Sequence, residues 1–534
     1  MRLVSLFIDN LRAASNVLLP LSPLTALVGA NGAGKTTIID ALDRFFGGSD
    51  MPRGDLGSPT RPVTVTVTFD SAPVIDGEFS VTRTWVPAGG TARARGTTSH
   101  DLTGEEQEAV MASVQVTRIP AERTAAGDRT GMGGLGLAGM LREAVAGEAG
   151  NPIHAEEQRR RQAYQNLHFS PKLDRFRSEV NKRLRGPSAG SAGYAPDIEA
   201  LFSLERPEIE PAVRVRFSRE GRTYDHAGAG HGAKRAYHMA AIEAHASLSA
   251  GAGQTRLLLV DEPELYQHPQ RQRRILEAYR EISRNGRLQI VYTTHSPFLV
   301  DLRSLSGVHK VARNREQEIV VRGCGSVDDG LARLRLSRYI VDGIFADGAI
   351  LVEGMQDVAV IGAVFSALRT GGVSVAKWLD GRNVSMIHCE GVNDVPHFMR
   401  FFRALGVPTF VIWDADSNDA DHVNNRRILD LLGARGFTWG KEPGCSGCDI
   451  GDGYACFASD CCVYFREELG CDVPDSGLRT ADQRRAVQAR IKSRIADEMG
   501  QAHGIDRRFG GAEFPKSDFA TRVVPHILRH FGHP

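Results

Sequence analysis

The sequence predicts an α/β protein in which two separate regions each contain a parallel sheet. Three observations lead to this expectation. A glycine-rich stretch at residues 29–36 stands between an apolar run and a helical pattern, and a second apolar run at residues 257–260 ends in two acidic residues. From about Ala349 onward, apolar strands alternate with helical segments, which is the order expected of a parallel sheet.

Length and composition fit a globular protein of more than one domain. The chain has 534 residues, of which 42% are hydrophobic and 24% are charged. No apolar run approaches the roughly 20 residues that cross a bilayer, and the first residues lack the pattern of a signal peptide. We therefore expect a cytoplasmic protein without a membrane partner.

The charge balance does not decide whether the protein binds nucleic acid. The chain carries 65 basic and 64 acidic residues, for a net charge of +1. Basic clusters occur at residues 159–161 and 271–274, but such runs are usually solvated helix faces. The function must be read from motifs.

Most of the first 120 residues read as strands. Residues 3–8 and 63–69 alternate apolar and polar side chains, residues 79–85 are the expected hairpin partner of the latter, and residues 24–28 are an apolar run. The charged segment 155–185 has helical character and lies between Gly/Ala-rich stretches. We interpret it as an inserted helical region that serves dimerisation.

Residues 29–36 read GANGAGKT, which is a complete P-loop pattern between a strand and a helix. Its glycines let backbone N–H groups surround phosphate oxygens, and the helix N-terminus favours negative charge. Lys35 is expected to reach the β- and γ-phosphates of ATP, and the Thr36 hydroxyl to ligate Mg²⁺. The expected nucleotide contacts are Asn31, Gly32, Gly34, Lys35, Thr36, Thr37 and Asp261.

The run at residues 257–260 ends at Asp261 and Glu262, as a Walker B strand does. Asp261 is expected to hold Mg²⁺ through its water shell, and Glu262 to orient and deprotonate the attacking water, because phosphoryl transfer depends on positioning and charge neutralisation. A further apolar strand at residues 288–292 is followed by His295.

These motifs resemble those of ABC- and SMC-type ATPases. The resemblance implies that His295 is the switch histidine that contacts the γ-phosphate. It also implies a homodimer, or a higher homo-oligomer, in which two heads close around two ATP molecules. The candidate signature loop at residues 228–235 departs from the transporter pattern, because it lacks the leading serine.

A second set of acidic residues follows two later strands. The strand at residues 349–352 ends at Glu353, with Asp357 close behind, and the strand at residues 409–413 ends at Asp414 and Asp416. Parallel strands place such residues at one edge of a sheet. Clustered carboxylates require divalent cations, and oxygen ligands suit Mg²⁺ or Mn²⁺. The alternative is that these are acidic turn residues.

An E-G-x-x-D strand end followed by a D-x-D strand end resembles the Toprim domain. An ABC-type head followed by Toprim resembles the OLD (overcoming lysogenization defect) family over nearly the whole chain. The resemblance implies that Glu353 is a metal ligand or general acid/base. It also implies that Asp357 supports Glu353 and is a further candidate metal residue, and that Asp414 and Asp416 bind metal.

The same resemblance implies two later residues. Glu467 or Glu468 corresponds loosely to a later metal-binding acid of the family. Lys516 corresponds to a lysine that stabilises charge on the transition-state phosphate. The alternative for Lys516 is an exposed helix-capping residue.

These motifs divide the chain into four expected segments. Residues 1–125 and 211–335 form the two parts of the ATPase head, residues 126–210 form the inserted helical region, and residues 336–534 form the Toprim domain. Six of the eight cysteines lie in the Toprim part. A structural Zn²⁺ at Cys445, Cys448, Cys456 and Cys461 is one interpretation, and free thiols in a variable insert are the other.

The functional hypothesis is an ATP-binding and ATP-hydrolysing, Mg²⁺- or Mn²⁺-dependent endonuclease that cleaves DNA under nucleotide control. The family resemblance implies a role in bacterial defence against phage, and in some relatives a helicase-like partner. The alternatives are a Toprim effector that acts on RNA or tRNA, and a non-enzymatic scaffold switched by ATP.

Overall fold

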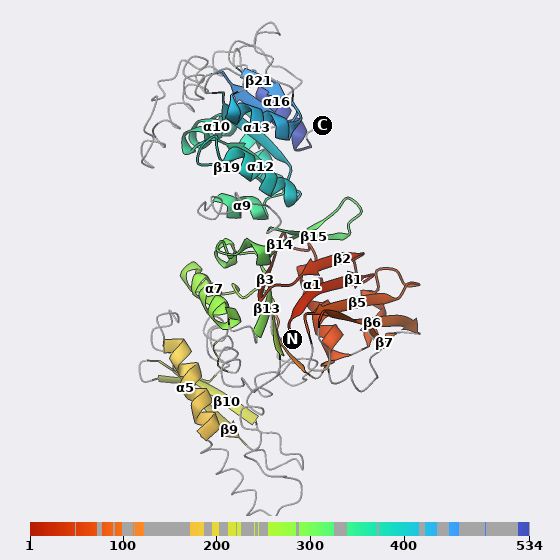
Figure 1. The fold of residues 1–534 in the computed structure, drawn as a ribbon. Helices are drawn as coiled ribbons and strands as arrows, with labels where there is room; N and C mark the ends of the chain where they lie inside the picture. Colours follow the sequence, from red (N-terminus) through yellow and green to blue (C-terminus); the bar gives the residue numbers. More distant parts are fainter. Residues whose placement is uncertain are drawn as a thin grey trace, which may run out of the picture. The chain divides into compact units, whose positions relative to one another are not determined.

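The computed structural model divides into two compact units, residues 1–323 and 324–534 (Figure 1). The structure describes residues 1–48, 50–71, 77–88, 91–98, 110–111, 113–121, 171–185, 195–201, 212–219, 222–225, 240, 244, 255–284, 288–324, 339–370, 373–415, 422–434, 448–458, 486 and 522–532.

The first unit begins with an antiparallel sheet. Its strands, in spatial order, are β2 (Val17–Pro20), β1 (Leu3–Asp9), β5 (Val63–Phe69), β6 (Phe79–Ala88), β7 (Thr91–Thr98) and β4 (Met51–Pro52). In β5 each valine is buried and each threonine is half-buried. This alternation confirms the predicted strand, and its pairing with β6 confirms the predicted hairpin.

The second sheet of this unit is parallel except for one edge strand. Its order is β15 (Ile319–Gly323), β14 (Val308–Arg313), β3 (Leu24–Val28), β13 (Leu288–Thr294), β12 (Thr255–Val260) and β8 (Val114–Ile119), with β15 antiparallel to β14. Every residue of β12 and β13 is buried. The three apolar runs predicted as strands therefore pair with one another in the order β3, β13, β12.

Helices cover this parallel sheet. Helix α1 (Lys35–Gly47) packs on β8, β12 and β13, and its apolar face joins a core shared with the antiparallel sheet. Helix α7 (Pro269–Arg284) packs on β3 and β13. Short 3-10 turns complete the unit: η1 (Arg53–Asp55), η3 (Pro297–Leu299) and η4 (Leu305–Gly307).

The expected inserted region contains a helix and also strands. Helix α5 (Pro171–Arg185) confirms the predicted helical character and packs on β9 (Ala195–Leu201). Strand β9 pairs with β10 (Ala212–Arg219), which pairs with β11 (Arg222–Asp225), all antiparallel (Figure 1). The expected boundary between residues 210 and 211 thus falls between two paired strands. The Gly/Ala-rich flanks and the candidate signature loop lie outside the described residues.

The second unit contains a five-stranded sheet, as predicted from the alternating pattern. Its order is β19 (Val384–His388), β16 (Gly348–Val352), β20 (Thr409–Asp414), β22 (Tyr454–Phe457) and β21 (Cys448–Gly451), and only β21 is antiparallel to its neighbour. A small ladder joins β17 (Arg369–Thr370) to β18 (Val373–Ser374).

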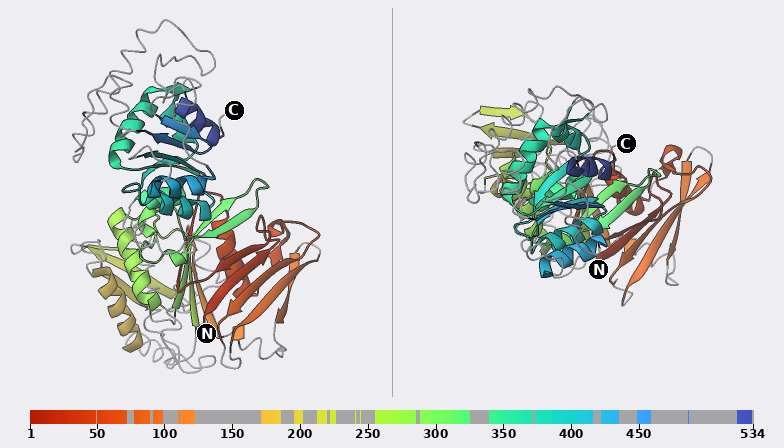
Figure 2. Two further views of the ribbon diagram at one scale, coloured as in Figure 1. Left: turned by 45° about the horizontal axis from the view of Figure 1, so that its top comes forward. Right: turned by 90° about the horizontal axis from the view of Figure 1, so that it is seen from above.

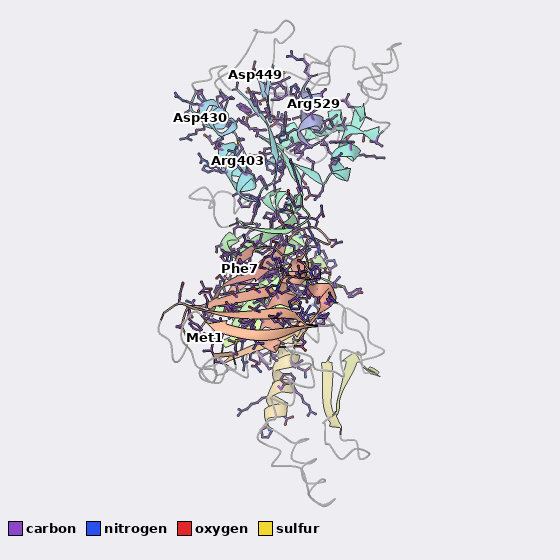
Figure 3. The ribbon with its side chains drawn as sticks, turned by 90° about the vertical axis from the view of Figure 1, so that its right-hand side faces the viewer. Met1, Phe7, Arg403, Asp430, Asp449 and Arg529 are labelled. Carbon is purple, nitrogen blue, oxygen red and sulfur yellow. The ribbon has the colours of Figure 1, made fainter. Side chains whose placement is uncertain are left out.

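Helices lie on both faces of this sheet (Figure 2). One hydrophobic core includes residues of α10 (Met355–Ala367), α11 (Val375–Gly381) and α16 (Val524–His530). On the other side, α12 (Val395–Ala404) packs against α9 (Tyr339–Phe345) and α13 (Val423–Leu432). Arg403 of α12 donates to the carbonyl oxygen of Leu431 in α13 at 3.3 Å. Figure 3 labels Arg403 and Asp430, the residue that precedes Leu431. This layering leaves the carboxyl ends of the parallel strands free to carry a site.

No helix in the ranges that the structure describes combines the length and the apolar character that crossing a bilayer requires.

The burial of two leucines on the paired strands β1 and β2 predicts that replacing each by alanine has a different effect on stability. Leu6 of β1 is 0% exposed, whereas Leu18 of β2 is 58% exposed. Leu6→Ala should lower the free energy of unfolding by about 2–5 kcal/mol, because it leaves a cavity in a packed core. Leu18→Ala, the same change on the paired strand, should alter it by less than about 0.5 kcal/mol. Chemical denaturation of the full chain measures both, and equal effects would contradict the assigned strand register.

A buried histidine predicts acid sensitivity of the first unit. His309 of β14 is 2% exposed, and within the described part of the chain neither ring nitrogen has a hydrogen-bond partner. Burial lowers the pKa of His309 from 6.5 to about 4. The unfolded chain therefore binds the proton more tightly, so stability present above pH 6.5 is lost as the pH falls toward 4. His309→Leu should flatten this part of the pH–stability curve, measured by denaturation. An unchanged slope would show that other groups dominate.

Candidate active sites

The P-loop joins β3 to α1 in a conformation that requires glycine. Gly29 has a φ of +148°, and a Cβ atom there would lie 2.1 Å from the Val311 carbonyl oxygen of β14. Gly34 has a φ of +108° and caps the N-terminus of α1. Asn31, Gly32 and Thr36 are exposed on this loop, whereas Thr37 is buried in the helix. The loop therefore presents its backbone and the Thr36 hydroxyl outward, as a phosphate site does.

Lys35 is buried and folded back on the loop. Its ammonium group donates to the carbonyl oxygens of Gly29 at 3.0 Å and Ala30 at 2.9 Å, and it lies 2.8 Å from His295 Nε2. Burial lowers the pKa of Lys35 to about 8, and three carboxylates of the Walker B turn partly oppose this shift. The lysine is thus held at the position where the P-loop curves around a phosphate.

Thr293 holds the two Walker B acids. Asp261 and Glu262 directly follow β12, and Thr293 lies on the adjacent strand β13. The Thr293 hydroxyl donates to Asp261 Oδ1 at 3.1 Å and accepts from the Glu262 backbone N–H at 3.0 Å. Glu262 has a φ of +46°, in the left-handed region. Sequence reasoning missed Thr293, although it lies two residues before the predicted His295.

His295 bridges the P-loop and the Walker B turn. Its Nε2 lies 2.8 Å from Lys35 Nζ and 3.5 Å from Glu262 Oε1. Burial and the charge of Lys35 lower the pKa of His295, so the ring is neutral and Nε2 accepts from the lysine. The His295 backbone N–H donates to Glu264 Oε1 at 2.6 Å. Sequence reasoning missed Glu264, whose only signal is a third acid in the turn after β12.

The residues present fit Mg²⁺ and a nucleotide. Asp261 is buried, and burial raises the pKa of its carboxyl group, while Arg118 and Thr293 act in the opposite direction. Such a carboxylate needs positive charge nearby. Together with the exposed Thr36 hydroxyl it offers the oxygen ligands that Mg²⁺ prefers. The structure therefore brings together the P-loop, both Walker B acids and His295 in one site.

In the second unit, two predicted carboxylate residues meet at one sheet edge. Strands β16 and β20 pair in parallel, with Val352 opposite Ile412. Glu353 and Asp414 are therefore neighbours, both half-buried, and the Asp414 backbone N–H lies 3.5 Å from Glu353 Oε2. This confirms the prediction that these strand ends converge. The same sheet edge carries the end of β19, which pairs with β16 on its other side.

Asp357 supports the turn beside Glu353. Its Oδ2 accepts a hydrogen bond from the Gly354 backbone N–H at 2.8 Å, which caps the start of α10, and its side chain is buried. Asp357 thus fixes the backbone that carries Glu353. The other residues predicted for this site, Asp416, Glu467 and Lys516, lie outside the described residues.

Two cysteines of the predicted zinc site point in different directions. Cys448 of β21 pairs with Phe457, and Cys456 of β22 pairs with Asp449, so neighbouring positions of one ladder place the two thiols on opposite faces. Burial and the nearby Asp414 carboxylate raise the pKa of Cys456, which keeps it protonated. These two thiols therefore do not share one Zn²⁺ in this arrangement. Cys445 and Cys461 lie outside the described residues.

The described ranges contain no group of three or more His, Cys, Asp or Glu side chains placed to hold one metal ion. Among the described residues, Glu353 and Asp414 come together at the edge of the second sheet, and Asp416 and Glu467 lie outside those ranges. The carboxylate oxygens of these two residues are ligands that suit Mg²⁺ or Mn²⁺.

Comparisons with known proteins match the two predicted domains. An AAA ATPase domain model matches residues 1–95 and 152–300, and an overcoming lysogenization defect protein-like TOPRIM domain model matches residues 344–416. An OLD nuclease of Thermus scotoductus is 25% identical, over 80% of this chain and 88% of its own length. The Old nuclease of Escherichia phage P2 is 24% identical, over 78% and 77% respectively.

Among solved structures, an Smc head bound to the C-winged helix domain of ScpA matches with 16% identity, covering 60% of this chain and 97% of that chain, at a TM-score of 0.41.

A P-loop ATPase domain followed by a Toprim domain defines the class of protein. Both domain models match this chain in that order, and the two OLD nucleases align with it over most of its length. The chain is therefore similar to the OLD nucleases over about 80% of its length, with an AAA-type ATPase domain followed by an OLD-like Toprim domain.

The geometry of the nucleotide site predicts that two variants fail at different steps. Lys35→Ala should abolish ATP binding, because Lys35 lies where ground-state phosphate contacts form. Glu262→Gln should leave ATP binding within about threefold and lower hydrolysis by at least about 100-fold, because the amide cannot accept the proton of water. Equilibrium binding of a fluorescent ATP analogue and phosphate release measure the two steps. Normal hydrolysis by the Glu262→Gln protein would show that another group is the base.

Proposed function

We propose that this chain hydrolyses ATP and cuts DNA with divalent cations, and that the occupancy of the ATPase site controls when cutting occurs. The observation that carries the proposal is the convergence of Glu353 and Asp414 at one sheet edge, in a chain where Lys35 of the P-loop also lies beside His295. The two relatives named as OLD nucleases support the same activity.

In the ATPase site, each residue has a distinct task. Lys35 exchanges one or more of its three acceptors for phosphate oxygens, and Thr36 and Asp261 would hold Mg²⁺. Glu262 orients the attacking water and takes its proton, while the neutral His295, which already lies within reach of Lys35 and Glu262, contacts the γ-phosphate. Phosphoryl transfer of this kind requires positioning and charge neutralisation more than covalent chemistry.

In the Toprim site, Glu353 and Asp414 would hold the divalent cations, with Asp416 and Glu467 as further ligands. Bound cations would neutralise the scissile phosphate. The hydrogen bond with the Asp414 backbone N–H fixes Glu353 Oε2 at the sheet edge, where it serves as a ligand or as the base that activates water. Asp357 holds the turn that carries Glu353. Lys516 would stabilise negative charge on the phosphate.

The partners follow from the same assignment. Both relatives are named as nucleases, which supports a nucleic-acid substrate. DNA is the proposed substrate in preference to RNA, as the family resemblance implies. Two ATPase heads would close around two ATP molecules, which makes a homodimer the smallest functional assembly. The phage source of one relative supports a role in conflict between bacteria and phage, alone or with a helicase-like partner. The protein would act in the cytoplasm.

Two carboxylate variants separate the nuclease from the ATPase. Asp414→Asn should lower plasmid cleavage by at least about 100-fold, because it removes a charge that a divalent cation needs. The rate of ATP hydrolysis should stay within about twofold, since Asp414 belongs to the other unit. Asp430→Asn is the matched control, because it makes the same change at an exposed position of α13. Supercoiled-plasmid nicking with Mg²⁺ or Mn²⁺, with and without ATP, measures cleavage.

The converse variant completes the test. Lys35→Ala should change how cleavage depends on ATP without removing cleavage itself. If Asp414→Asn cuts plasmid as well as the unmodified chain, the nuclease assignment fails and an ATP-switched scaffold becomes the better account. If the unmodified chain cuts tRNA but not plasmid, the substrate is RNA.

A further inference from the structure

Both oxygens of the Asp261 carboxylate accept hydrogen bonds from neighbouring strands. Its side chain is 4% exposed. One oxygen, Oδ1, accepts from the Thr293 hydroxyl at 3.1 Å, and the other, Oδ2, accepts from Arg118 Nη2 at 3.3 Å. The Thr293 contact belongs to the neighbouring strand β13. The Arg118 contact comes from β8, on the other side of β12.

Arg118 is itself held by helix α1. Its Nη2 lies 2.6 Å from Asp40 Oδ1, and its Nη1 donates to Asp43 Oδ2 at 3.0 Å. Asp40 is one helical turn beyond Thr36, and Asp43 is two turns beyond it. One guanidinium group therefore contacts the Walker B acid and the helix that begins at the P-loop.

The pairing of charges continues away from the site. Arg12 Nη1 donates to Asp40 Oδ2 at 2.6 Å, and Arg12 Nε donates to Asp55 Oδ1 at 2.8 Å. Arg12 and Arg118 therefore both contact Asp40. The other partner of Arg12 is Asp55 of η1, whereas Arg118 also contacts Asp261. The two arginines have the same charge and both contact α1, Arg12 through Asp40 and Arg118 through Asp40 and Asp43, but of the two it is Arg118 that contacts Asp261.

We infer that Arg118 is a positioning residue for the Mg²⁺ site: it fixes the Asp261 carboxylate relative to α1, and so relative to Thr36. This inference rests on the proposed ATPase function. The two groups expected to hold one cation come from different elements, Thr36 from α1 and Asp261 from the end of β12. The guanidinium group of Arg118 contacts residues of both elements.

The physical basis is the geometry of the guanidinium group. It is planar and presents several N–H donors at fixed angles, which allows one arginine to hold two or three carboxylates in a defined arrangement. Residues that orient a metal ligand in this way affect metal affinity by about 10–100-fold when they are changed. Lysine, with a single ammonium group on a flexible stem, keeps the charge but not the fork.

The test compares Arg118→Met, Arg118→Lys and the matched control Arg12→Met in the full chain. The first readout is the affinity for a fluorescent ATP analogue, measured in EDTA and then across a Mg²⁺ titration. The second is the Mg²⁺ concentration that half-saturates ATP hydrolysis, together with kcat at saturating Mg²⁺. Far-UV circular dichroism and thermal melting report whether each variant folds.

We expect Arg118→Met to raise the half-saturating Mg²⁺ concentration about 10–100-fold, with nucleotide affinity in EDTA within about threefold of the unmodified chain. Arg118→Lys should restore part of the loss, and Arg12→Met should leave Mg²⁺ dependence unchanged. If Arg118→Met does not fold, Asp43→Asn provides the test, since it removes one anchor of Arg118 on α1 and should shift Mg²⁺ dependence in the same direction by less.

The other outcomes overturn the inference. An unchanged or lower Mg²⁺ requirement in Arg118→Met would mean that the arginine is neutral toward the cation or competes with it. Equal shifts in Arg118→Met and Arg12→Met would mean that both arginines act only through the stability of α1. If the unmodified chain itself shows no Mg²⁺-dependent ATP hydrolysis, the proposed ATPase function fails, independently of Arg118.

Discussion

Parallel strand pairing is the constraint on which both candidate sites depend. Strands that run side by side in one direction must end at the same edge, and the loops that follow them then share a small volume. In the first unit this brings the P-loop after β3, the acids after β12 and His295 after β13 together, although more than 200 residues separate the first from the others. In the second unit the same rule brings Glu353 beside Asp414.

Burial makes compensation of charge the second requirement. A buried ionised group is costly unless an opposite charge or hydrogen bonds accompany it. In the first unit, buried groups of opposite charge lie together. Lys35 lies among three carboxylates, and Arg118 lies among Asp261, Asp40 and Asp43. In the second unit the Glu353 carboxylate instead lies 3.5 Å from a backbone N–H, and a protonated Cys456 thiol lies nearby.

The sequence predicts those parts of the sites that depend on local order along the chain. A P-loop is recognisable because glycines, Lys35 and the following helix are contiguous, and Glu353 and Asp414 are recognisable because each ends an apolar run. Thr293, Glu264 and Arg118 were not predictable, because their roles depend on which strands become neighbours. β8 and β12 pair although about 140 residues separate them in the sequence, and no local sequence pattern indicates that pairing. Likewise, residues 195–201 lack the alternation that would predict β9, and the opposite directions of Cys448 and Cys456 follow from a ladder register that spacing alone does not reveal.

The ammonium group of Lys35 has three donors, and three acceptors lie within hydrogen-bond distance of it: two loop carbonyls and the ring of His295. An arriving phosphate oxygen therefore replaces an acceptor and adds none. Binding becomes an exchange, whose free energy is the difference between two sets of hydrogen bonds and not the sum of one. If the acceptor given up is His295 Nε2, the ring becomes available to the γ-phosphate at the moment the nucleotide enters. The contact between Lys35 and His295 would then couple the entry of a nucleotide to the hydrogen bonding of the histidine ring.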